Sequence, residues 1–345
     1  MNLLEDEVNL QLLRYLVSGE GIHVNINAIA KEFNIHRNTA KKKIQWLYDQ
    51  KIINPPFYSF PYLYTQWPIL VLVKADIPRS NEINEFYIDD SHIFAAFSCM
   101  EGPYNTLLIE FFENLESYHS WRERIVIEEK IPNREYRAPA HAYIFSNKLT
   151  FKNDPNCFIK SLKRSYQDQE YVMLNKCKLD ETIFPIFEQL MLGNFIQRND
   201  TYISSELGLN RKTIKHHIDQ LLENQIIEEP RCYFPNLFVP PEYNLIVSML
   251  EITSQNEKVK EYILNHDNIP RAQDTSTGCY NLLLFSAFHT IEGFFDLGEE
   301  FLNMFPQDIG AISNIILSSR MIHTIKPQKL SLGWIDRKLW DVKHK

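Results

Sequence analysis

One predicted helix carries side chains that could bind a nucleic acid. Between residues 37 and 49, apolar residues recur at Ala40, Ile44 and Leu47, which is the spacing of one buried helix face. An arginine can hydrogen-bond to guanine or a phosphate, an asparagine can pair with adenine, and lysines neutralise phosphates. These residue types make up the opposite face and predict contact with double-stranded DNA: Arg37, Asn38, Lys41, Lys42 and Gln45.

The same pattern occurs again later in the chain. The segment Ile29–Ile53 aligns without gaps with Ile203–Ile227, and Asp6 aligns with Asp180 at the same offset of 174 residues. Asp219 lies on the polar face of the second helix, where a carboxylate opposes a phosphate, so the second copy is predicted to bind DNA more weakly. The predicted DNA-binding residues of the second copy are Arg211, Lys212, Lys215 and His216.

Each basic helix is the third of three predicted helices. In the first copy, apolar periodicity predicts helices over residues 8–17 and 26–33 before it, and a short turn follows the second of them. In the second copy this turn contains Gly208, and a glycine readily adopts the left-handed backbone that such turns need. Strands are expected after Ile53 and Ile227. The order predicts a winged helix-turn-helix module, whose third helix enters the major groove. The alternative is a basic face that only keeps the helix solvated.

A second predicted module follows each helix-turn-helix. Strands are expected over residues 69–75, 92–100, 104–112 and 136–145, with helices over 82–88 and 115–126. This βαββαβ order is typical of a ferredoxin-like antiparallel sheet backed by two helices. The second copy repeats it over residues 243–324. Because helices cover one face of each sheet, we expect the two uncovered faces to pack against each other within one chain.

Two related segments, MEGPYNTLLIEFFENLESYHSW and TSTGCYNLLLFSAFHTIEGFF, together with the order of modules, resemble the Lrp/AsnC family of leucine-responsive regulators. The resemblance implies a DNA-binding domain followed by a ligand-sensing domain, with a small-molecule effector near a glycine-containing loop. Both copies have asparagine where the family often has aspartate, and a simple hairpin turn is the alternative explanation. Carried over, the resemblance marks as ligand-binding Gly102, Tyr104, Asn105, Gly278, Tyr280 and Asn281.

The predicted fold class is α+β, with two winged helix-turn-helix domains and two ferredoxin-like domains in tandem. We expect the two copies to form an intramolecular pseudo-dimer, with further self-association left open. The expected boundaries are residues 1–58 and 59–148 for the first copy, a linker over 149–179, residues 180–232 and 233–330 for the second copy, and a C-terminal tail over 331–345.

Composition narrows the expected class of protein. The chain has 345 residues, a net charge of −8 and 44% hydrophobic residues, which is typical of several globular domains rather than a disordered chain. The acidic total requires that any DNA-binding surface be local. Five cysteines without a close pair predict reduced thiols and no metal site. No cofactor, no membrane segment and a cytoplasmic location are expected.

Two other functions compete with DNA binding. The sirohaem decarboxylases resemble the same architecture, occur as fused pairs and carry a Tyr-Asn-Leu-Trp segment similar to YNTLL and YNLLL. The histidine that those enzymes place upstream is absent here, although His92 and Arg271 are possible substitutes. The sequence therefore predicts a protein that is not an enzyme. The third possibility is a helix-turn-helix module that binds protein.

Overall fold

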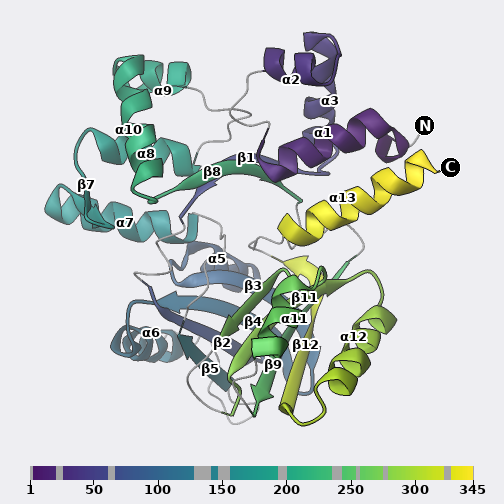
Figure 1. The fold of residues 1–345 in the computed structure, drawn as a ribbon. Helices are drawn as coiled ribbons and strands as arrows, with labels where there is room; N and C mark the ends of the chain where they lie inside the picture. The colour runs from purple at the N-terminus through teal and green to yellow at the C-terminus, as the bar shows by residue number, and fades with distance from the viewer. Residues whose placement is uncertain are drawn as a thin grey trace.

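The computed structural model describes residues 3–20, 26–60, 67–127, 141–146, 156–192, 200–234, 243–253, 257–274, 279–321 and 328–344. Within these ranges the chain folds as two copies of one α+β unit (Figure 1). Each unit has a helix-turn-helix module and a ferredoxin-like domain. No helix in the described part of the chain is long and apolar enough to cross a membrane.

The helix-turn-helix modules have matching geometry. After a short 3-10 helix, η1 (Leu3–Glu5), the first module contains α1 (Glu7–Ser18), α2 (Ile26–Glu32) and α3 (Arg37–Asp49). The second contains α8 (Ile183–Leu192), α9 (Asp200–Leu207) and α10 (Arg211–Glu223). The turns before α3 and α10 both use a left-handed backbone, with φ of +49° at Asn34 and +64° at Gly208. The turn predicted at Gly208 is therefore confirmed.

The strands that follow the two modules pair with each other. Strands β1 (Asn54–Ser59) and β8 (Glu228–Tyr233) form a two-stranded antiparallel sheet, with Asn54 opposite Tyr233. We predicted a wing for each module, but the strand from one copy pairs with the strand from the other. The backbone N–H and C=O groups of a single strand need hydrogen-bond partners, and here each copy supplies the partner strand for the other. This pairing holds the two modules together.

The two ferredoxin-like domains share one sheet. The first contains β2 (Ile69–Ala75), α5 (Asn81–Asp89), β3 (Ile93–Glu101), β4 (Tyr104–Phe112), α6 (Leu115–Ile127) and β5 (His141–Ser146). The second contains β9 (Asn244–Ile252), α11 (Glu257–Asn265), β10 (Arg271–Asp274), β11 (Leu282–Phe288), α12 (Ile291–Met304) and β12 (Ile309–Met321). The strand order is β10-β11-β9-β12-β3-β4-β2-β5, and all pairs are antiparallel.

The uncovered faces of the two half-sheets are buried, as we expected. Leu70 and Ile109 of the first domain belong to the same hydrophobic cluster as Val247 and Phe285 of the second. The arrangement also differs from simple face-to-face packing, because β12 pairs with β3 and joins the half-sheets edge to edge. Pairing these two strands removes two exposed sheet edges that would otherwise invite association with other chains.

The segments predicted to be a linker and a tail are folded. Residues 156–179 form α7 (Asn156–Gln169) and the hairpin of β6 (Val172–Leu174) and β7 (Cys177–Leu179). The C-terminal residues form α13 (Gln328–Lys343), which packs beside α1 in Figure 1. Each helix follows the last strand of one ferredoxin-like domain and packs on the helix-turn-helix module of the other copy. The copies are therefore intertwined.

Candidate nucleic-acid interface and ligand sites

Helix α3 presents the predicted basic face to solvent. Ala40, Ile44 and Leu47 are at most 2% exposed and anchor the helix to its module. The predicted DNA-binding residues on the other side are all exposed: Arg37, Asn38, Lys41, Lys42 and Gln45. Gln45 donates a hydrogen bond to Asp49 within the helix, at 2.8 Å. The cationic part of this face lies in the first two turns, where a helix-turn-helix protein contacts DNA.

The lysines of α3 differ in their ion pairing. Lys43 points back to the first helix, and its Nζ lies 3.7 Å from the Asp6 carboxylate. No described acidic residue forms an ion pair with Arg37, Lys41 or Lys42. A cation that already has an acidic partner must lose it to bind a phosphate, whereas an unpaired cation only releases water and counterions. Arg37, Lys41 and Lys42 are therefore the strongest candidates for phosphate contact.

Helix α10 has the same length, cap and orientation of faces. Its N-cap Asn210 accepts a hydrogen bond from the backbone of Lys212 at 2.8 Å, as His36 does from Asn38 at 3.2 Å in α3. Asp219 is half-buried on the polar face, near the acidic Glu223. The four predicted DNA-binding residues of α10 are exposed: Arg211, Lys212, Lys215 and His216.

The pairing of β1 with β8 fixes the positions of α3 and α10 relative to each other. Figure 1 shows α3 and α10 on either side of β1 and β8, at the end of the molecule away from the ferredoxin-like domains. Contacts of α1 with β8 and of α8 with β1 bind each module to the other copy's strand. The fold therefore holds two helices with exposed basic residues in a fixed relation.

The asparagines predicted to bind a ligand are engaged with the protein backbone. Asn105 accepts a hydrogen bond from the Ile77 backbone N–H at 3.0 Å and donates to the Ile77 carbonyl at 2.9 Å. Asn281 makes the same pair of bonds with Ile252, both at 2.6 Å. These amides extend the sheet at the end of the first strand of each domain. Their geometry explains why asparagine, which both donates and accepts, occupies the position.

Of the other residues of the predicted ligand sites, Tyr280 contacts the other copy. Gly102 is in an exposed turn with φ of +56°, which favours glycine. The ring centroids of Tyr280 and Tyr143 are 6.2 Å apart, so this tyrosine links the second domain to β5 of the first. Tyr104 lies 5.8 Å from His141. Gly278 falls outside the described residues.

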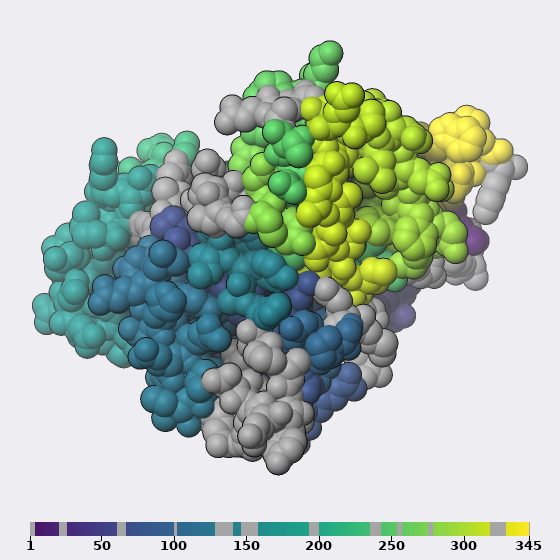
Figure 2. Space-filling model, turned by 90° about the horizontal axis from the view of Figure 1, so that it is seen from below, coloured from purple at the N-terminus to yellow at the C-terminus, as the bar shows by residue number. Residues whose placement is uncertain are grey.

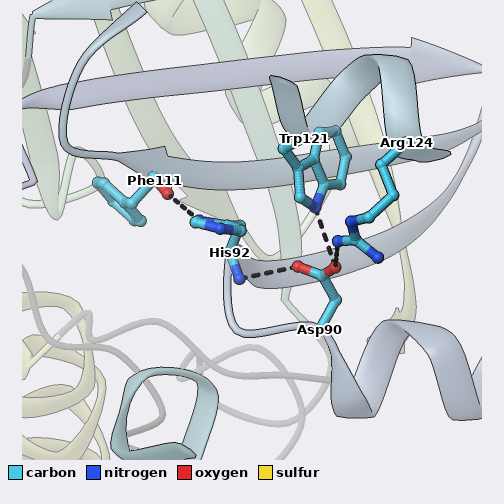
Figure 3. Close-up of polar contacts among 5 residues, drawn as sticks. All are labelled: Asp90, His92, Phe111, Trp121 and Arg124. Atoms are coloured by element: carbon cyan, nitrogen blue, oxygen red, sulfur yellow. Dashed lines mark hydrogen bonds and ion pairs between the residues drawn. The ribbon is translucent and has the colours of Figure 1, made fainter. Parts of the chain in front are cut away.

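His92, one of the two possible substitutes for a catalytic histidine, is part of a packed cluster (Figure 3). Its ring stacks on Phe112 at 4.6 Å, and its Nδ1 lies 3.1 Å from the Phe111 carbonyl oxygen, which requires a proton on Nδ1. Burial lowers the pKa of His92, against a smaller opposing effect of Asp90. The ring is therefore neutral at neutral pH and is held as a structural element.

Asp90 organises the rest of this cluster. Its carboxylate accepts hydrogen bonds from the His92 backbone N–H and the Trp121 indole, both at 2.9 Å, and from Arg124 at 3.2 Å (Figure 3). The Asp90 side chain is only 6% exposed, so these bonds compensate for the loss of water. The cluster fixes α6 on the sheet.

Arg271, the other possible substitute, lies far from His92 in the sheet. Arg271 begins β10, whereas His92 directly precedes β3, and three strands separate β10 from β3. Arg271 is 9% exposed and donates to Gln273 at 3.0 Å. The two residues do not form one site.

Sequence reasoning missed two features of the ferredoxin-like domains. Glu110 is fully buried in β4, and no described residue hydrogen-bonds either of its carboxylate oxygens. A cavity of about 490 Å³ lies between the second half-sheet and α12. A glutamate inside an otherwise apolar strand was a usable signal for the first feature. The second depends on how closely α12 approaches the sheet, which periodicity does not reveal.

The comparisons with known proteins support the fold. No protein-family model and no curated protein sequence matches the chain. The solved structure of the siroheme decarboxylase NirDL with an iron-uroporphyrin III analogue matches with a TM-score of 0.59 and 12% identity, over 98% of this chain and 99% of that one. A second NirDL structure matches with a TM-score of 0.58 and 11% identity, over 99% and 100%. Escherichia coli AsnC covers 40% of this chain and 90% of its own, with 15% identity and a TM-score of 0.33.

These findings correct one expectation. The prediction that the chain is not an enzyme is contradicted, because the structures that match it over its full length are those of an enzyme, a siroheme decarboxylase. At 11–12% identity the likeness establishes shared architecture. The chain has an α+β fold of two winged helix-turn-helix modules and two ferredoxin-like domains, which it shares with NirDL from end to end.

Proposed function

We propose that the chain binds double-stranded DNA, mainly through α3 and more weakly through α10. One observation carries this proposal: Arg37, Lys41 and Lys42 form an exposed cationic face on a helix whose other face is anchored in its module. The net charge of −8 makes this local concentration of unpaired cations more distinctive, since the chain as a whole is acidic. Sequence preference would come from Arg37 and Asn38, which can pair with base edges.

Selection from a random pool of duplex DNA tests the proposal. The full chain is incubated with the pool at a series of salt concentrations, and the bound fraction is sequenced after each round. We expect enrichment of a motif with two unequal half-sites, because α3 and α10 are related by the repeat but differ in charge. No binding at low salt would refute the proposal, and binding without any enrichment would refute the sequence preference assigned to Arg37 and Asn38.

A second candidate function is the binding or decarboxylation of a siroheme-like tetrapyrrole, which the full-length likeness to NirDL favours. The described cavity is a poor fit for a macrocycle with several carboxylates, because no arginine, lysine or histidine lines it. Arg271 is a buried cation that could hold a carboxylate elsewhere in the second domain. Adding siroheme to the purified chain and recording its absorption spectrum and the release of carbon dioxide tests this candidate. An unchanged spectrum with no carbon dioxide release would exclude it.

A further inference from the structure

The second ferredoxin-like domain contains an apolar cavity between its sheet and α12. Its volume is about 490 Å³, which is within the range of small-molecule sites. Strands β9, β11 and β12 form its floor, and α12 forms its roof. Figure 2 shows β12 and α12 side by side on this face of the molecule. Phe295 and Leu302 of α12 are 59% and 46% exposed near the opening.

The repeat shows which side chains leave space for the cavity beneath α12. Helices α6 and α12 begin at equivalent positions, Leu115 and Ile291, and from this alignment Trp121 corresponds to Leu297 and Arg122 to Gly298. Trp121 is 4% exposed and fills the space between α6 and the sheet. Leucine and glycine are smaller, so α12 leaves that space open. A cavity lined by apolar side chains loses packing energy, and a ligand that fills it regains that energy.

The floor of the cavity carries polar side chains for which the described part of the chain offers no hydrogen-bond partner. Ser248 of β9 is 5% exposed and lies directly opposite Asn314 of β12. No described residue hydrogen-bonds the Ser248 hydroxyl or the Asn314 amide. Both line the cavity, where a strand would usually place aliphatic side chains. Asn314 is exposed, so Ser248 is the buried member of the pair. A buried polar group without a partner is unfavourable, so Ser248 marks where a ligand would be hydrogen-bonded.

The charge of the lining restricts the chemistry of the ligand. Glu299 is the one ionisable residue among the residues that line the described cavity, and it is exposed. A carboxylate or phosphate in this cavity would lose water without gaining a cation. We propose that the cavity binds a small, mainly apolar molecule with one neutral hydrogen-bonding group, such as a carbonyl, and no acidic group. This site does not depend on DNA binding.

The test uses the fluorescent naphthalene ketone Prodan, which is neutral, apolar and carries one carbonyl. A side chain added at Gly298 meets no atom within 4 Å of its Cβ position, so Gly298→Leu should fill the cavity without distorting the helix. Gly333→Leu is the matched control, because Gly333 is also in a helix with free space at Cβ and does not line the cavity. We expect one Prodan molecule to bind per wild-type chain. Gly298→Leu should bind Prodan at least ten-fold more weakly, whereas Gly333→Leu should bind it as the wild type does.

Two further measurements test the role of the Ser248 hydroxyl and whether a second copy of the chain occupies the cavity. Ser248→Ala keeps the cavity but removes the hydroxyl, so bound Prodan should emit at shorter wavelength because its carbonyl loses a hydrogen bond. Equal Prodan affinity in wild type and Gly298→Leu would overturn the proposal, since the probe would then bind elsewhere. Sedimentation velocity across a concentration series provides the other check. If the wild-type chain self-associates and Prodan is displaced as it does so, the cavity is a contact for a second copy and the proposal is wrong.

Discussion

Glu110 lies in an environment that is unusual for a glutamate. Its side chain is fully buried, and burial raises the pKa of its carboxyl group well above the usual range of a glutamate, with a further increase from the charge of Asp90 and a decrease from Arg122. The folded chain therefore holds a proton on Glu110 at pH values where the unfolded chain has released it. Stability from this group is complete below the unfolded pKa and falls as the pH rises toward the folded pKa.

Replacing the Glu110 carboxyl group with a neutral amide of the same shape removes its contribution to the pH dependence of the free energy of unfolding. We expect Glu110→Gln to become more stable relative to wild type as the pH rises above about 4.5, by ~1.4 kcal/mol per pH unit until the folded pKa is reached. Urea denaturation of both proteins between pH 4.5 and 8.5 measures the difference. A difference that stays constant with pH would show that Glu110 is ionised in the folded state.

The equivalent asparagines Asn105 and Asn281 provide a second test at the scale of single residues. An aspartate at Asn105 or Asn281 keeps the acceptor but cannot donate to the carbonyl of Ile77 or Ile252. We expect Asn105→Asp and Asn281→Asp each to lower the free energy of unfolding by about 1–3 kcal/mol, with thermal melting as the measurement. Glu113→Gln, an exposed change just after β4, should leave the melting temperature unaltered. Unchanged stability in the asparagine variants would indicate that these amides are available for a ligand.

Among the elements, α13 connects the second ferredoxin-like domain with the first helix-turn-helix module. Near its start, Lys329 donates to the Leu264 carbonyl at 2.9 Å. Farther along the helix, Arg337 donates to the Tyr243 hydroxyl at 2.7 Å. On its other side, Asp336 pairs with Arg14 of α1 at 2.8 Å, and Ile335 is fully buried in the core of that module. The helix therefore supports α1 from the opposite copy.

Truncating the buried contact should loosen the module that α13 supports. We expect Ile335→Ala to cost about 2–5 kcal/mol and to speed hydrogen exchange in α1 more than in α8. Lys338→Ala is the control, since Lys338 is exposed on the same helix. Equal exchange rates in α1 for wild type and Ile335→Ala would contradict a supporting role for α13.

The elements also show what could be predicted from the sequence. Helices α3 and α10 were predictable because the apolar spacing of Ile44 and Ile218 and the gapless repeat are local signals. The pairing of Asn54 with Tyr233 could not be predicted, because no local sequence signal specifies a strand partner so distant in the chain. The sequence predicts a linker where α7 forms. In the structure, Phe158 and Tyr166 of α7 pack on other elements, and the rings of Tyr166 and Phe184 stack at 4.2 Å. The cavity escaped prediction because it depends on side-chain volume at Leu297 and Gly298.

At the scale of the whole molecule, each of the two copies contributes elements that pack on the other copy. The β1–β8 sheet, the β3–β12 edge and the helices α7 and α13 each join one copy to the other. Most of these contacts bury apolar surface, so separation of the copies would expose large parts of both cores. The relation between α3 and α10 is therefore fixed by the fold rather than by association of two chains.

The most direct test of the central claim is DNA affinity as a function of salt. Fluorescence anisotropy with the selected duplex is recorded from 50 to 300 mM salt for wild type and for Lys41→Ala, Lys42→Ala. If both lysines contact phosphates, the double variant should bind more weakly, with a log-log salt slope smaller by about two. Lys163→Ala is the control, because Lys163 is ion-paired with Glu188 on α8. Unchanged affinity and slope in the double variant, with circular dichroism showing an intact fold, would contradict DNA binding by α3.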